Sequence, residues 1–130
     1  VQKTSLLYLK LCCPWFVMQI KIGIIAKYIS SGDFSLSDSY ASVIEAIKHA
    51  AWNNGANVEI VWIDSVELEE DSSKLEELRD LSGIIVPGGF GNSGIEGKLN
   101  AIKYARENNI PFLGICLGMQ LSTIEFARNV

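Results

Sequence analysis

The chain has 130 residues, which fits one domain better than two, and 48% of them are hydrophobic, enough to form a core. Its net charge of −4 argues against nucleic acid or an anionic membrane surface as a partner. Three cysteines are too few for a disulfide framework or a four-ligand zinc site, so we expect no metal.

Residues 1–19 precede the first strand signal, and we interpret them as a leader or linker remnant. The apolar stretch from Leu6 to Ile25 is interrupted by Lys10, Pro14 and Gln19, so it does not read as a membrane span. The segment loosely resembles a signal peptide but has no small-residue cleavage site. Without an export signal, a cytoplasmic location is the expectation.

Strand and helix signals alternate along the rest of the chain. Short apolar runs, the first of them rich in β-branched residues, predict strands at 20–26, 58–63, 83–86 and 112–115. Helical spacing and capping signals predict helices from Ser37 or Asp38 to Asn53, at about 73–79, at 96–108 and at 117–127. This alternation predicts right-handed crossovers and a parallel sheet covered on both faces, the doubly wound α/β class.

Two glycine-bearing segments follow the third and fourth predicted strands, where active sites form in open α/β sheets. The first contains Gly88-Gly89, whose bare backbone N–H groups suit an approaching anion. The second, 114–118, fits G-x-C-x-G, a nucleophile elbow with sulfur in place of hydroxyl. It would place Cys116 at a helix N-terminus, where the macrodipole favours thiolate. The N–H of Leu117 and one from the glycine turn would face a developing oxyanion.

The elbow motif alone is weak evidence, because small residues also surround buried, inert cysteines. The strand before it, the helix after it and the second glycine turn together favour the nucleophile interpretation. His49 is the only histidine and precedes Cys116 on the first predicted helix. We interpret His49 as a surface residue and not as a general base.

Several segments are similar to the glutamine amidotransferase domain of CTP synthases, namely 83–91, 105–120 and 124–129. Upstream, 38–49 resembles that family's first helix and 58–64 its second strand. The P-G-G and G-x-C-x-G motifs mark class I amidotransferases, and D-x-Y-x-S and G-I-E-G-K narrow the resemblance to CTP synthases. The resemblance implies a flavodoxin-like doubly wound parallel sheet of the class I glutamine amidotransferase type, in truncated form.

The resemblance assigns residues 20–130 to a partial amidotransferase domain that acts on L-glutamine. Cys116 would attack the side-chain amide, form a glutamyl thioester and release ammonia. A separate synthetase domain would use the ammonia to convert ATP-activated UTP to CTP in pyrimidine nucleotide biosynthesis. Gly89, in the Gly88–Gly89 turn, and Leu117 would supply the oxyanion donors. The residues that would shape the glutamine pocket are Phe90, Gly118, Met119 and Gln120.

The chain also departs from the family pattern. The family's triad needs a His and a Glu well downstream of the nucleophile, and this sequence stops at Val130. We therefore expect little or no glutaminase turnover by the isolated chain. ATP, UTP and Mg²⁺ would bind the synthetase domain, so we expect no cofactor here. Ser93 stands where the family commonly has an arginine tied to GTP activation, which makes GTP activation doubtful. An exposed sheet edge would favour self-association.

Other interpretations stay open. A non-catalytic fragment or interaction module with the same fold predicts that Cys116 reacts no faster than a free thiol. Glyoxalase- or chaperone-like proteins often pair the elbow cysteine with a His close after it and a Glu on the first strand, whereas Leu117 follows Cys116 here and 20–26 contains no acid. A phosphate-binding loop at 88–94 would need the Lys-Ser or Lys-Thr of a P-loop, which is absent from that segment. We interpret the acidic tract 67–71 as a solvated face.

Overall fold

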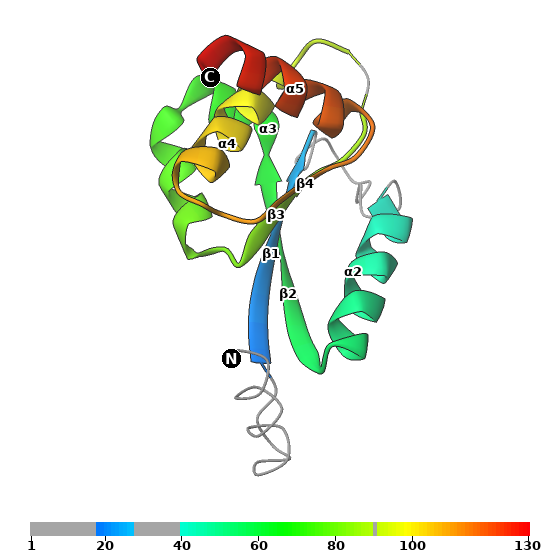
Figure 1. The fold of residues 1–130 in the computed structure, drawn as a ribbon. Helices are drawn as coiled ribbons and strands as arrows, with labels where there is room; N and C mark the ends of the chain where they lie inside the picture. Colours follow the sequence, from blue (N-terminus) through cyan, green and yellow to red (C-terminus); the bar gives the residue numbers. More distant parts are fainter. Residues whose placement is uncertain (1–17, 28–39, 90) are drawn as a thin grey trace.

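The computed structural model describes residues 18–27, 40–89 and 91–130. In this part of the chain four strands form one sheet in the order β2-β1-β3-β4, with every neighbouring pair parallel (Figure 1). This order is that of flavodoxin-like sheets, so the predicted fold class is confirmed. The strands are β1 (Met18–Ala26), β2 (Ala56–Asp64), β3 (Gly83–Val86) and β4 (Phe112–Gly114).

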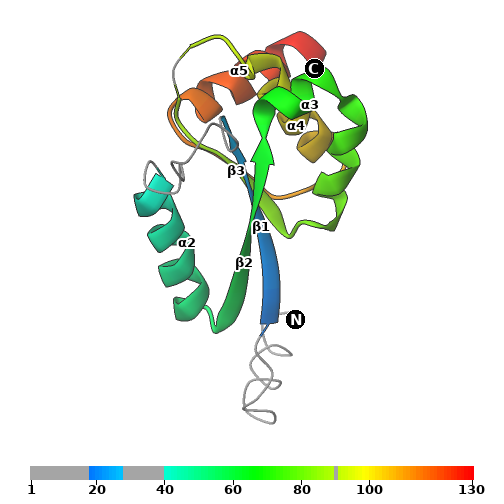
Figure 2. The same ribbon diagram turned by 180° about the vertical axis from the view of Figure 1, so that it is seen from behind.

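Helices cover the two faces of the sheet unequally (Figures 1 and 2). Among the described helices α2 is the one on its face of the sheet, and α3, α4 and α5 gather on the other face with η2, a 3₁₀ helix. The helical segments are α2 (Ala41–Asn53), α3 (Ser65–Glu70), η2 (Ser72–Asp80), α4 (Ile95–Glu107) and α5 (Leu117–Asn129).

The main core lies between the sheet and the face that carries α3, α4 and α5. Because side chains alternate along a strand, Ile84 and Val86 of β3 point to this face, while Ile85 points to α2. Strand and helix residues then close the cluster, including Ile25, Ile63, Leu68, Leu78, Leu99, Ile102 and Leu121. On the α2 face an apolar groove remains, and Leu113 of β4 is 55% exposed there. The core therefore fixes α4 and α5 against the ends of β3 and β4.

The predicted strands agree with the observed ones, and β1 and β2 each begin two residues earlier, at Met18 and Ala56. The expected helix caps Ser37 and Asp38 lie outside the described residues. The short helix expected at 73–79 is present as η2, whereas α3, which precedes it directly after β2, was not predicted.

Two capping aspartates explain this pair of helical segments. The backbone N–H of Val66 donates to Asp64 Oδ1 at 2.8 Å, which begins α3 directly at the end of β2. The backbone N–H of Ser73 donates to Asp71 Oδ1 at 2.9 Å, which begins η2. Buried Leu68 and Leu78 then anchor the two segments to the core.

The cap at Asp64 leads to a stability prediction. Changing Asp64 to Ala leaves the Val66 N–H without its acceptor, and we expect it to lower the free energy of unfolding by about 1 kcal/mol. Urea unfolding followed by circular dichroism would measure the change. The control is Glu70→Ala, at an exposed position in the last turn of the same helix, which should change stability far less. Equal effects of the two variants would contradict the capping role.

Candidate functional site

The structure brings the two predicted glycine segments together at the carboxyl ends of β3 and β4. Val86 pairs with Gly114 in the strand register, and the N–H of Ile115 donates to the Val86 carbonyl at 2.9 Å. Beyond this pair the chains stay adjacent. A Cβ placed on Gly88 would lie 3.6 Å from Cys116 Cβ and 4.0 Å from Cys116 Sγ. The glycine turn therefore borders the sulfur directly.

Cys116 occupies a strained turn between β4 and α5. Its φ of 54° and ψ of −107° lie in a region that residues with side chains rarely adopt. The turn is held by the N–H of Gly118, which donates to the Ile115 carbonyl at 3.0 Å, and by the N–H of Gln120, which donates to the Cys116 carbonyl at 3.2 Å. Cys116 is exposed and precedes the first helical residue. This is the geometry of a nucleophile elbow.

The two glycines that flank the elbow have no room for a side chain. A Cβ on Gly118 would stand 2.0 Å from the Val86 carbonyl oxygen. A Cβ on Gly114 would stand 2.6 Å from the carbonyl carbon of Gly118. Real Cβ atoms do not approach backbone so closely. The close approach of the start of α5 to Val86 of β3 and to Gly114 of β4 thus explains the spacing of G-x-C-x-G.

The remaining predicted site residues fall around the elbow. Leu117 is partly buried, and its Cδ2 lies 3.8 Å from the Cβ position of Gly89. Met119 is 53% exposed, and Gln120 is also exposed in the first turn of α5. Phe90 lies outside the described residues. The placement is compatible with the predicted roles, which stay predictions.

Two lysines beside the glycine loop were missed by the sequence interpretation. Lys98 of α4 is 2% exposed, and its Nζ lies 3.3 Å from the Cβ position of Gly89. Lys27 is 9% exposed, and its Nζ lies 3.3 Å from the Cβ position of Gly91. Burial lowers the pKa of Lys98, and the nearby charge of Lys27 lowers this pKa further. A signal was present, since Lys98 shares helical spacing with the buried residues Ala101, Ile102 and Ala105.

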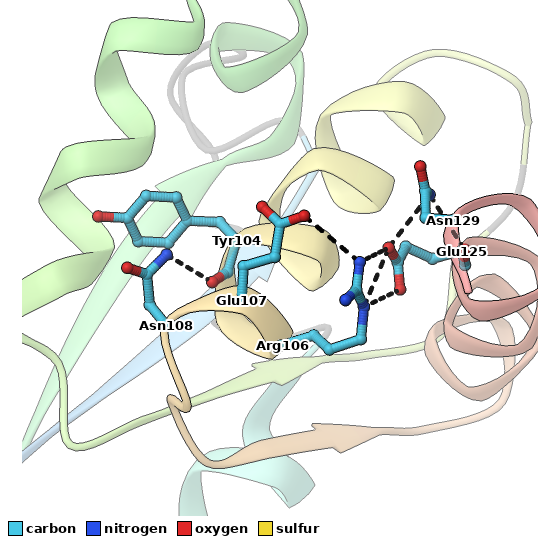
Figure 3. A network of polar contacts seen from close by, with 6 residues as sticks. All are labelled: Tyr104, Arg106, Glu107, Asn108, Glu125 and Asn129. Carbon is cyan, nitrogen blue, oxygen red and sulfur yellow. Dashed lines mark hydrogen bonds and ion pairs between the residues drawn. The ribbon is translucent and has the colours of Figure 1, made fainter.

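A polar clamp joins the helix that follows the elbow to α4 (Figure 3). Arg106 donates from Nε to Glu125 Oε2 at 3.0 Å and from Nη2 to Glu125 Oε1 at 2.8 Å. Asn129 Nδ2 adds a hydrogen bond of 3.1 Å to Glu125 Oε1. Because Arg106 hydrogen-bonds the buried carboxylate, the pKa of Glu125 is held below its ordinary value. The clamp fixes α5, and with it the elbow at its N-terminus.

His49 lies away from this site. α2 runs from the carboxyl side of the sheet back to the start of β2, so its last turns lie near the amino ends of the strands (Figure 1). His49 is exposed there, and its ring centroid is 5.6 Å from that of Trp52. Within residues 18–27, 40–89 and 91–130, no group of three His, Cys, Asp or Glu side chains could hold a metal ion. No helix in these ranges is long and apolar enough to cross a membrane.

Comparison with known proteins places the chain among amidotransferases. A family model described as "Glutamine amidotransferase class-I" matches residues 35–130. A CTP synthase of Methanosarcina acetivorans is 54% identical over 112 residues, which are 86% of this chain and 20% of the relative. A CTP synthase of Staphylococcus aureus has the same identity over the same shares. The chain thus spans about a fifth of the length of the curated relatives it matches.

A solved structure supports the same relationship at the level of the fold. The glutaminase domain of a Trypanosoma brucei CTP synthase with bound acivicin superposes with a TM-score of 0.76 and is 39% identical in sequence. The match covers 85% of this chain and 41% of that one. The sheet, the flanking helices and the sequence therefore agree on one family.

Proposed function

Because the chain belongs to the class I glutamine amidotransferase family, we propose that it carries the nucleophile of a CTP synthase glutaminase domain and acts on L-glutamine. The observation that supports this most directly is the elbow. Cys116 is exposed at a positive φ, at the N-terminus of α5, with the Gly88 Cβ position 4.0 Å from its sulfur. A glycine turn and a thiol in this arrangement suit acyl transfer.

The proposed reaction begins when the Cys116 sulfur attacks the side-chain carbonyl carbon of glutamine. The S–C bond forms, and the carbonyl oxygen becomes an oxyanion that the N–H groups of Gly89 and Leu117 would stabilise. The C–N bond then breaks, and the nitrogen takes up a proton and leaves as ammonia. A glutamyl thioester remains, and water hydrolyses it to glutamate. Phe90, Met119 and Gln120 would contact the bound glutamine.

Proton transfer in this reaction needs a general base and acid, and we propose that the 130-residue chain does not provide them. Its single histidine, His49, is exposed on α2 near the amino ends of the strands. The isolated chain is therefore expected to capture an electrophilic glutamine analogue without turning glutamine over.

The fate of the ammonia is also part of the proposal. It would pass to a CTP synthase synthetase domain, which would use ATP and Mg²⁺ to aminate UTP to CTP. The chain spans about a fifth of the length of the CTP synthases it matches, and we assign none of its residues to the binding of ATP, Mg²⁺ or UTP. We expect GTP activation to be weak, because Ser93 stands at the position of the family's arginine. A cytoplasmic location follows from this function.

Covalent labelling tests the proposal. We expect acivicin and a diazo-ketone analogue of glutamine to label Cys116 about tenfold or more faster than Cys12 and Cys13, because the elbow exposes the sulfur at the N-terminus of α5 beside the glycine turn. Peptide mapping by mass spectrometry would locate the label. Excess glutamine should slow labelling at Cys116 alone, and Cys116→Ser should abolish it.

The opposite result would favour the interaction-module interpretation. Labelling of Cys116 at the rate of Cys12 and Cys13, unaffected by glutamine, would mean that this chain does not recognise the substrate. Circular dichroism on the same samples would separate loss of recognition from loss of the fold.

A further inference from the structure

Two buried lysines lie near the carboxyl ends of β1 and β3, where the crossover connections of the sheet switch from one face to the other. β1 leads to α2 on one face and β3 leads to α4 on the other, so the connections switch faces between the carboxyl ends of these two neighbouring strands. Lys27 follows β1 directly, and Lys98 is a buried residue of α4. Their ammonium nitrogens lie beside Gly91 and Gly89, respectively. Both ammonium groups therefore lie next to glycines that follow β3, on the segment that borders Cys116.

The burial of Lys98 is costly on its own. Its side chain is 2% exposed, and no described carboxylate forms an ion pair with it. The charged group that acts on it most strongly among the described residues is Lys27, which repels it. A buried ammonium next to a second cation destabilises the fold unless a negative charge compensates it. A buried cation with no compensating carboxylate among the described residues suits the stabilisation of an anion that forms nearby.

We propose that Lys98, supported by Lys27, is a positioning residue that gives the glycine loop a positive field for the anionic sulfur and oxyanion at Cys116. Lys98 would act across Gly89, whose Cβ position lies 3.3 Å from the Lys98 Nζ. The field stabilises negative charge on the sulfur before attack and on the carbonyl oxygen after it. The oxyanion part rests on the proposed function, whereas the effect on the sulfur and on approaching anions does not.

Two alkylating reagents of different charge test this field. Iodoacetate is an anion and iodoacetamide is neutral, and the ratio of their rates at Cys116 reports the local potential. We expect Lys98→Met to lower this ratio about fivefold, because one positive charge near the sulfur is removed. Lys98→Arg should keep the ratio. Lys103→Met, at an exposed position of the same helix, should leave it unchanged.

A purely structural role for Lys98 predicts a different pattern, since a distorted loop would change both rates by the same factor. An unchanged ratio in folded Lys98→Met would overturn the proposal. If that variant does not fold, the unaltered chain still tests the proposal. The ratio of the iodoacetate rate to the iodoacetamide rate at Cys116 should fall as the ionic strength rises from about 0.01 M to 0.5 M, and it should fall more than the same ratio at Cys12 and Cys13. The proposal would also be overturned if the ratio at Cys116 fell no more than the ratios at Cys12 and Cys13. Protection by glutamine is scored separately, so the proposed function and the field can fail independently.

Discussion

Replacing Gly118 by alanine is expected to lower the free energy of unfolding by on the order of 4 kcal/mol and to remove any enhanced reactivity of Cys116. The added Cβ would stand 2.0 Å from the Val86 carbonyl oxygen, which already accepts the N–H of Ile115. Relief requires α5 to move away from β3, which unpacks the core on that side. Urea unfolding would measure the loss of stability, and alkylation with peptide mapping would measure the reactivity of Cys116.

Gly88→Ala is the matched control for this prediction. Its added Cβ would meet Cys116 Cβ at 3.6 Å, an ordinary van der Waals distance. We therefore expect a stability change within about 1 kcal/mol, since alanine also restricts the unfolded chain. If Gly118→Ala were as stable as Gly88→Ala, the close contact between α5 and β3 would not exist in solution.

Changing Arg106 to methionine is expected to lower the melting temperature by on the order of 10 °C at neutral pH. The change leaves the carboxylate of Glu125, which is 2% exposed, without its cation. Glu125→Gln should cost less, roughly half as much, because it leaves a guanidinium that keeps about a third of its surface in water and lies 3.5 Å from Glu107. Differential scanning calorimetry would measure both changes.

The clamp also gives a pH dependence with a defined sign. The pKa of Glu125 is lowered in the folded chain, so the ion pair contributes stability above the ordinary pKa of 4.5 and loses it as the pH falls through the lower folded value. In Arg106→Met, burial without a cation should raise this pKa instead, so the cost of the mutation should shrink towards pH 4.

Arg128→Met is the control for the clamp, because the Arg128–Glu96 pair at 3.5 Å joins the same two helices on the exposed surface. Its effect on the melting temperature should be about 1–2 °C or less. A cost for Arg106→Met that is as small as this, or constant between pH 4 and 7, would contradict a buried clamp.

The parts of the fold that depend on local signals could be predicted from the sequence. The apolar run at 83–86 forms β3 as expected, and the small residues around Cys116 predict the sharp turn that the structure shows. The alternation of strands and helices was enough to predict a parallel sheet, because crossovers have a fixed hand. The adjacency of Gly88 and Cys116 followed from the rule that the carboxyl ends of parallel strands share one edge.

The side-chain contacts between helices, and the burial of particular charged or acidic segments, could not be predicted. Arg106 and Glu125 are 19 positions apart, and nothing in either segment shows that their helices cross. α3 was not predicted because the charges of the acidic tract 67–71 are typical of a solvated segment. In the structure, buried Leu68 anchors this helix to the core. Lys98 was missed because a lysine within a helix is ordinarily solvated.

The carbonyl oxygen of Val86 makes two contacts at the end of β3. It accepts the N–H of Ile115, which continues the pairing with β4, and it forms the surface against which Gly118 packs. The strained turn at Cys116 and the pairing of the sheet are consequently parts of one cooperative unit. The elbow cannot relax by a local fluctuation that leaves the sheet intact. The orientation of the Cys116 sulfur therefore depends on the global folding equilibrium, and it is kept or lost together with the fold of the domain.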